Sequence, residues 1–234
     1  MKAVLKREIR SYFTSPIGYV CIAVLLALFG YWYYIVMLAG SSSNIPYVYS
    51  YMLSYCMMII PILTMKTISD DQKNKTDQAL LTAPVSVLSI VMGKFLAAFF
   101  VFFVAITGTL LPSVAISFFG APNWTEILGN YVGTLLYGGA MIAIGVFISS
   151  LTVSQIIAAI GTFAVSILLV IIGQISSSVS GTWIAEVVKW ISFESRYDPF
   201  TQGQFNLSSV VYFISVMAVF VFFTTRKIES RRYR

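Results

Sequence analysis

The chain has 234 residues, of which 58% are hydrophobic and only 10% are charged. Soluble domains carry about 25% charged residues, so this composition excludes an ordinary water-soluble domain. The absence of histidine removes the commonest metal ligand and general base. The formal net charge of +6 does not indicate a nucleic-acid partner, because in a membrane protein the placement of the basic residues carries the information.

The chain opens with residues 1–16, MKAVLKREIRSYFTSP. The apolar residues that can share one face of a helix here are Val4, Leu5, Ile9, Tyr12 and Phe13. Basic residues occupy the remaining faces, a pattern that predicts a helix lying in the membrane interface and ending at Pro16. The alternative is a plain basic anchor before a span. A cleaved signal peptide is disfavoured, because the apolar stretch that follows exceeds the usual 7–15 residues.

Six apolar runs are long enough to cross a bilayer as helices, which takes about 20 residues each. They cover approximately residues 17–38, 47–65, 87–119, 128–149, 154–175 and 207–225. We expect the third run to break near Pro112. Backbone groups in hydrocarbon must satisfy one another, and the runs lack the alternation of barrel strands. The sequence therefore predicts an all-α integral membrane protein with six transmembrane helices.

The basic residues fix the expected orientation. Thirteen of the fifteen Lys and Arg residues lie in the N-terminal segment, around the second connection or in the C-terminal segment. Only Lys189 and Arg196 lie in the other connections. Basic residues concentrate on the cytoplasmic side, so we expect both termini and the second connection to be cytoplasmic, which also requires an even number of spans.

The second connection, 67–84, is the longest polar stretch of the chain and reads TISDDQKNKTDQALLTAP. Ser69 or Asp70 is a suitable N-cap and Pro84 a stop. The stretch predicts a short amphipathic helix over about 69–83, parallel to the membrane. The alternative is a solvated loop without a partner.

The spans themselves offer little chemistry. Lys94 lies near the start of the third span, where we expect it to extend to the headgroups, and Glu126 lies at an outer edge. Cys21 and Cys56 fall in apolar runs and are interpreted as small hydrophobes. Ion-coupled carriers usually need a buried carboxylate, and no GxxxxGK[ST] motif is present. Energy for transport must then come from another chain.

Small residues are frequent in the fourth and fifth spans, where they allow close helix packing. Ordinary packing is the favoured interpretation, and a conduit is the alternative. The last connection, 176–206, contains an amphipathic, tryptophan-flanked stretch over 183–191 that suits an interfacial or re-entrant helix. After it, Glu194, Arg196 and Asp198 are candidates for pairing with one another, but no catalytic constellation accompanies them.

Three stretches resemble the ABC-2 family of ABC-transporter permeases, and within it the gliding-motility-type subunits. They are KREIRSYFTSPIGYV, SDDQKNKTDQALLTAPVSVLSIVMGKFLAA and YDPFTQGQFNLSSVVYFIS. The likeness covers nearly the whole chain. Lys75 stands where that family pattern leads us to expect Gly, and Gln78 where Glu is commoner.

The resemblance implies a type V exporter-like ABC-2 permease in the bacterial cytoplasmic membrane. Its parts would be a connector helix (1–16), a six-helix transmembrane domain (17–225), a coupling helix (69–83), an outside re-entrant segment (176–206) and a basic cytoplasmic tail (226–234). The implied partners are two ABC ATPase subunits, which bind ATP and Mg, a second identical or homologous permease chain and membrane lipids. An extracytoplasmic accessory subunit is a further possible partner. The resemblance implies no enzyme activity, cofactor or metal for this chain.

The resemblance also assigns residues to these parts. The ATPase-coupling candidates are Asp70, Asp71, Lys73, Lys75, Thr76, Asp77, Gln78, Leu80 and Leu81. The connector-helix candidates are Lys6, Arg7, Glu8, Arg10 and Tyr12, and those of the outside segment are Trp183, Trp190, Glu194, Arg196 and Asp198. The expected function is export of an amphipathic, lipid-like or peptide substrate. The alternative is relay of ATPase work to an extracytoplasmic partner, as in a motility complex.

Overall fold

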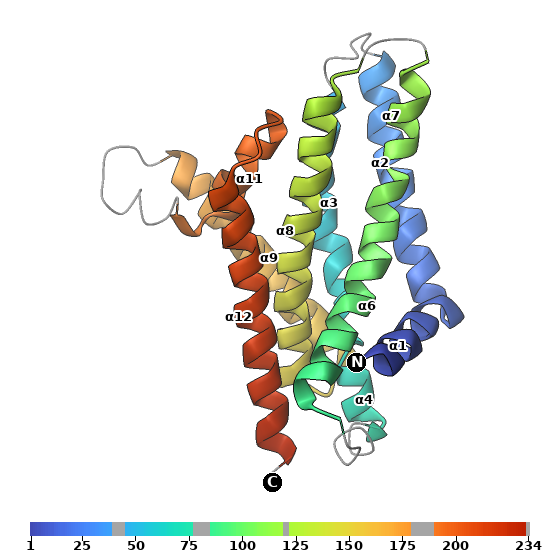
Figure 1. The fold of residues 1–234 in the computed structure, drawn as a ribbon, viewed down its shortest axis with the longest axis vertical. Coiled ribbons are helices and arrows are strands. Elements are labelled where there is room, and N and C mark those ends of the chain that lie inside the picture. The colour runs from blue at the N-terminus through green and yellow to red at the C-terminus, as the bar shows by residue number, and fades with distance from the viewer. Residues whose placement is uncertain (39–44, 77–84, 119–121, 179–189, 233–234) are drawn as a thin grey trace.

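The computed structural model describes residues 1–38, 45–76, 85–118, 122–178 and 190–232 (Figure 1). The described residues contain ten helices and no strand. The helices are α1 (Lys2–Thr14), α2 (Pro16–Leu38), α3 (Ile45–Thr64), α4 (Ser69–Lys73), α6 (Val87–Gly108), α7 (Leu110–Ile116), α8 (Trp124–Leu151), α9 (Gln155–Ser178), α11 (Phe193–Thr201) and α12 (Leu207–Arg232).

Five segments of the described chain are long and apolar enough to cross a membrane. They are Pro16–Val36, Val87–Ile116, Trp124–Leu151, Gln155–Gln174 and Leu207–Arg231. Each corresponds to one of the six spans predicted from the sequence. The remaining prediction, 47–65, corresponds to α3, a 20-residue helix that packs beside α2, α8 and α9 but is not among these five.

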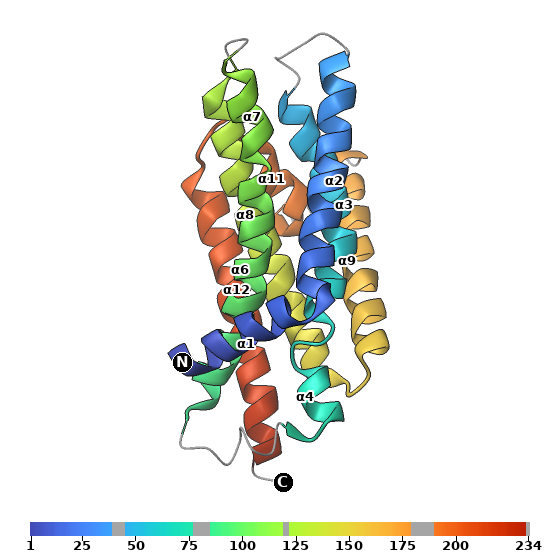
Figure 2. The ribbon, with the colours of Figure 1, turned by 90° about the vertical axis from the view of Figure 1, so that its right-hand side faces the viewer.

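The long helices form an elongated bundle with both chain termini at the same end (Figures 1 and 2). Helices α1 and α4 lie at that end, together with the last turns of α12. We call it the basic end because most Lys and Arg residues of the chain belong to these segments. Helix α8 occupies the centre, where it contacts α3, α6, α9, α11 and α12. In its most apolar 18-residue window 72% of the residues are buried, against 22% for α2, α9 and α12.

Glycine makes the central position of α8 possible. A Cβ at Gly138 would collide with the ring of Phe102 on α6, and a Cβ at Gly145 would collide with Thr64 on α3. Without a Cβ these backbones approach closely, as small residues allow between membrane helices. The small residues of this span therefore serve packing within the chain, the favoured one of the two interpretations.

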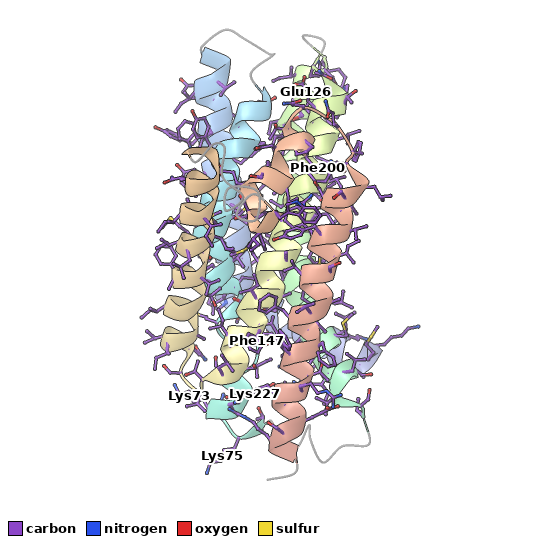
Figure 3. The ribbon with its side chains drawn as sticks, turned by 90° about the vertical axis from the view of Figure 1, so that its left-hand side faces the viewer. Lys73, Lys75, Glu126, Phe147, Phe200 and Lys227 are labelled. Carbon is purple, nitrogen blue, oxygen red and sulfur yellow. The ribbon has the colours of Figure 1, made fainter. Side chains whose placement is uncertain are left out.

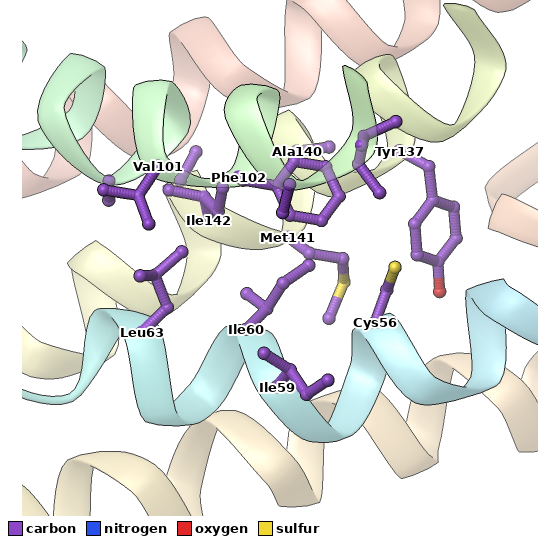
Figure 4. Close-up of a cluster of buried hydrophobic side chains, with 14 of the residues drawn as sticks. Cys56, Ile59, Ile60, Leu63, Val101, Phe102, Tyr137, Ala140, Met141 and Ile142 are labelled. Atoms are coloured by element: carbon purple, nitrogen blue, oxygen red, sulfur yellow. The ribbon is translucent and has the colours of Figure 1, made fainter. Parts of the chain in front are cut away.

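The core between α3, α6 and α8 is shown in Figure 4, where Cys56, Ile60, Phe102 and Met141 interdigitate. Cys21 and Cys56 are buried and form no disulfide, in agreement with their interpretation as small hydrophobes. Within the described part of the chain, no group of acidic or cysteine side chains is arranged to hold a metal ion.

The third predicted span divides into α6 and α7 at Thr109, three residues before the predicted break at Pro112. A proline cannot donate to the carbonyl four residues earlier, and its ring crowds that carbonyl. The disturbance therefore falls at Gly108. The hydroxyl of Tyr33 on α2 donates to the Pro112 carbonyl at 2.9 Å and ties the second half of the span to α2.

The ends of two elements differ from their sequence-based ranges. Helix α1 ends at Thr14, and Pro16 is the first residue of α2. Proline is favoured at this position because a backbone N–H, which it lacks, would have no helical partner there. Helix α12 continues to Arg232, so most of the predicted tail, 226–234, is helical. Residues 233 and 234 lie outside the described residues.

Candidate functional site

Lys94 of α6 is the centre of an ionic cluster at the basic end. Its Nζ lies 2.5 Å from Asp71 Oδ2 on α4 and 3.3 Å from Glu8 Oε1 on α1, and it donates to the Thr67 carbonyl at 2.6 Å. Lys94 is 3% exposed. The expectation that it extends to the headgroups is therefore wrong, because two carboxylates and a carbonyl hold it inside.

Arg7 is the second cation of the cluster. Its Nη2 lies 2.5 Å from Glu8 Oε1 and 3.7 Å from Asp71 Oδ2. The cluster thus balances two cations with two carboxylates, and its buried member, Lys94, is paired as a buried charge requires. Burial acts to raise the pKa of Asp71, but the Lys94 ammonium, a hydrogen bond from Thr76 and the Arg7 guanidinium hold that pKa below its usual value.

Helix α1 is also fixed to the chain that follows α3. The buried Tyr12 hydroxyl donates to the Leu63 carbonyl at 2.9 Å and lies 3.4 Å from Thr67 Oγ1. Lys66 Nζ donates to Ser15 Oγ at 3.0 Å. A tyrosine on an interfacial helix would face the headgroups, whereas this one faces protein. The polar contacts and the ionic cluster together hold α1 against the start of α4.

The last turn of α8 and the first residue of α9 hold another side of α4. The backbone N–H groups of Ile68 and Ser69 donate to Ser149 Oγ at 3.2 and 3.1 Å, and that hydroxyl donates to the Met65 carbonyl. Further along, Gln72 Nε2 donates to the Ser150 carbonyl at 3.2 Å. Gln155, the first residue of α9, donates to Asp70 Oδ1 at 2.7 Å. Helix α4 is therefore braced by α1, α6, α8 and α9 together.

Helix α4 ends at Lys73, so the described part of the stretch is not one continuous helix over 69–83. The side-chain amide of Asn74 donates to Asp70 Oδ1, and the backbone of Lys75 adopts φ +58°. Left-handed backbone ends a helix and is disfavoured for a residue with a Cβ. Lys75 is the position where the family pattern has Gly, so the unusual residue coincides with the unusual backbone.

Lys73 and Lys75 are exposed and project away from the bundle (Figure 3). Asp70 and Asp71 by contrast are engaged within the chain. Lys6 and Arg10 on α1 are also exposed. The candidates Asp77, Gln78, Leu80 and Leu81 lie outside the described residues.

At the opposite end, α11 packs against α8 and inserts alongside it. Phe200 lies against Gly129 and Gly133, and the ring centroid of Phe193 lies 5.7 Å from that of Tyr137. At 1.5 Å per residue, Tyr137 is about 20 Å along α8 from its first residue. Helix α11 thus buries Phe193, Tyr197 and Phe200 within the bundle and is not a surface loop.

The side chains predicted on the outside segment are not one paired group. The partners of the Arg196 guanidinium are Ser208 Oγ and the ring faces of Trp190 and Tyr212. Burial raises the pKa of Glu194, and the neighbouring Asp198 carboxylate raises it further. Trp183 lies outside the described residues.

Comparison with known protein families matches residues 33–225 to the model of the ABC-2 family transporter proteins. The chain belongs to the ABC-2 transporter family. The match covers most of the chain, from the end of α2 to the last turns of α12. A search of curated proteins finds no significant match. The permease is accordingly the membrane component of an ABC transporter, whose ATPase activity belongs to partner subunits.

Sequence reasoning found Glu8, Asp71 and Tyr12 as members of two predicted helices. It did not place the two carboxylates beside Lys94 or Tyr12 beside Leu63. It missed Ser149, Ser150 and Gln155 entirely. Lys94 had one signal that would have found it, since an ionisable residue inside an apolar run is a functional candidate by default. The serines had none, because short hydroxyl side chains are common in membrane helices.

We expect Lys75→Gly to stabilise the permease, because glycine adopts left-handed backbone without a steric penalty. The gain should be about 1 kcal/mol, the usual cost of that conformation for a residue with a Cβ. Hydrogen exchange of the α4 amides would report it as slower exchange. The matched control is Lys73→Gly at the last residue of α4, which should accelerate exchange because glycine is a poor helix former. Equal behaviour of the two variants would contradict the assigned backbone.

The lowered pKa of Asp71 predicts an acid-sensitive brace. A carboxyl group with a depressed folded-state pKa stabilises fully above its unfolded value, about 3.9 for Asp, and loses that contribution as the pH falls through the folded value. Thermal unfolding from pH 6 to pH 3 should therefore show a loss of stability below about pH 4. In Asp71→Asn this step should vanish and stability at neutral pH should be lower. Asp70→Asn leaves the Asp71–Lys94 ion pair intact and should therefore retain the step.

Proposed function

We propose that this permease crosses the bacterial cytoplasmic membrane six times, with both termini in the cytoplasm. Helix α3 would be the crossing that adds to the five apolar segments described above. Two permease chains, identical or homologous, would face each other above two ATPase subunits. The complex would export an amphipathic, lipid-like or peptide substrate. The concentration of basic residues at one end of the bundle supports this orientation.

The observation that carries the proposal is the bracing of α4. This five-residue helix has ion pairs or hydrogen bonds to α1, α6, α9 and the end of α8, while Lys73 and Lys75 point away from all of them. A segment fixed on its inner side, with exposed lysines on its outer side, suits transmission of force from a partner. Lys73, Lys75 and Thr76 are the proposed contacts to the ATPase, and α1 is the proposed connector helix.

The proposed mechanism is a lever. Closure of the ATPase subunits on ATP would displace α4, and its braces would pass that displacement to the spans. Such coupling requires that the ATPase bind the two permease conformations with different affinities. The cluster around Lys94 would carry the displacement to α1 and α6, and the hydrogen bonds of Ser149 and Gln155 would carry it to α8 and α9. The likeness of three stretches to gliding-motility-type permeases favours relay of force to an outer partner as the second candidate function.

The experiment reverses the exposed charges and spares the braces. In the purified complex, the double variant Lys73→Glu, Lys75→Glu should lose most stimulation of the ATPase by the permease while the permease still inserts and folds. The matched control is Lys227→Glu, which changes a cation on α12 at the same end of the bundle (Figure 3). Normal stimulation in the double variant, or equal loss in the control, would overturn the assignment. A purified complex without an ATPase would overturn the whole proposal.

A further inference from the structure

Helix α11 directs its charged side chains to two different sides. The Arg196 guanidinium faces α12, where its Nη1 donates to Ser208 Oγ at 3.0 Å and its carbon lies 5.4 Å from the Tyr212 ring centroid. The Trp190 ring covers the same group at 4.8 Å. Glu194 and Asp198 are one helical turn apart and line a cavity together with residues of α3, α8 and α9. The cation of α11 is therefore engaged elsewhere, and the cavity carries carboxylates.

The cavity has a volume of about 130 Å³. Its apolar wall consists of Leu53, Met57, Leu169 and Val170, and its polar wall includes Ser54 and Thr201 besides the two carboxylates. The Glu194 carboxylate is pressed against α9 at Gly173, where a Cβ would collide with its Oε2 atom. The packing of α9 thus fixes the position of one carboxylate at the edge of an apolar wall.

Tyr137 supplies an independent observation. Its side chain lines the same cavity and is 1% exposed, yet its hydroxyl has no hydrogen-bond partner among the described residues. Figure 4 shows that hydroxyl directed toward α3, beside Cys56. Buried polar groups are nearly always hydrogen-bonded. An unpartnered hydroxyl that lines a cavity beside a carboxylate therefore points to a polar occupant.

We propose that this cavity binds the ammonium group of a primary amine carried on an apolar chain. The inference rests on the proposed function, since it names the chemical class of the exported substrate. An ammonium group has three N–H donors. The Glu194 carboxylate and the Tyr137 hydroxyl oxygen would accept hydrogen bonds from them. The charge-assisted hydrogen bond to Glu194 is the stronger of these contacts. The apolar chain would lie along Leu53 and Leu169.

The size of the cavity sets the limits of the ligand. A water molecule takes about 30 Å³ of liquid volume, so the cavity admits a headgroup of a few heavy atoms and excludes a folded peptide or a whole lipid. The acidic wall disfavours anionic headgroups.

The test uses the purified complex in nanodiscs of phosphatidylcholine and phosphatidylglycerol, with dodecylamine as the probe and dodecanol as the uncharged counterpart. At pH 8 the amine is protonated, and this pH lies well above the ordinary pKa of glutamate. We expect dodecylamine, but not dodecanol, to bind saturably. Glu194→Gln should weaken it at least tenfold, and Tyr137→Phe several-fold. Gly173→Ala should also weaken it, because it displaces the carboxylate without changing the charge.

The matched control is Glu126→Gln, which removes a carboxylate from the first turn of α8 and should leave binding unchanged. Competition by phosphatidylethanolamine would identify a lipid headgroup as the source of the ammonium group, and its failure to compete would identify a free amphiphile. The proposal is overturned if dodecylamine does not bind saturably, binds no better than dodecanol, or binds Glu194→Gln as tightly as the unaltered chain. ATPase stimulation through Lys73 and Lys75 is measured separately, so either proposal can fail alone.

Discussion

Replacing Lys94 by Met should destabilise the permease by about 3 kcal/mol, the lower end of the range for removing one partner of a buried ion pair. Methionine keeps the length and apolar body of the side chain but leaves Glu8 and Asp71 facing each other without their central cation. We expect α1 and α4 to separate. Unfolding of the purified chain in mixed detergent micelles, followed by tryptophan fluorescence, would measure the loss.

A second substitution distinguishes the loss of charge from the loss of packing. In the Lys94→Met chain, adding Glu8→Gln and Asp71→Asn neutralises the carboxylates and should restore part of the stability. Packing alone would give no recovery. The same triple variant should still lack full stimulation of the ATPase, because neutral side chains do not reproduce the connection between α1, α4 and α6. Full recovery of both properties would show that the cluster has no mechanical role.

The second large effect is expected at Gly138, in the centre of α8. Valine there would place its Cβ on the ring of Phe102, which belongs to α6 and is itself fully buried. Overpacked cores lose about 1–3 kcal/mol, and we expect the upper end because both contacting groups are held by helices. The loss is measured by the same unfolding experiment.

Gly30→Ala is the matched control, since a Cβ at Gly30 meets nothing within 4 Å. Alanine is the better helix former by about 1 kcal/mol, so this variant should be neutral or more stable. If Gly138→Val were as stable as Gly30→Ala, the close approach of α6 and α8 would be wrong.

The sequence was sufficient for most of the fold, because long apolar runs must be helices in a membrane and their ends carry local signals. Pro112 illustrates the limit of such signals. The sequence showed that the third span would break, whereas the position of the break depends on the carbonyl that the proline ring crowds, at Gly108. In the same way, Pro84 indicated where a helix should stop, but α4 ends at Lys73 because Lys75 adopts left-handed backbone.

The candidate site was less predictable, because it depends on contacts between distant segments. Glu8, Asp71 and Lys94 come from three helices, and a single sequence holds no information on which cation meets which carboxylate. The oxygen of Ser149 meets backbone N–H groups some 80 residues away along the chain. The resemblance did mark one special position near the site, since Lys75, one of the two residues that depart from the family pattern, has a positive φ.

The anchoring of α1 also bears on how the protein is made. This helix leaves the ribosome before the groups that hold it, because the carbonyl that accepts from Tyr12 belongs to a residue 51 positions later and Lys94 follows later still. At a synthesis rate of roughly 5–20 residues per second, the newborn helix waits several seconds for its permanent neighbours. During that delay α1 can bind the lipid headgroups through its amphipathic pattern. This pattern therefore has a role in biogenesis, even though Tyr12 is buried in the folded protein.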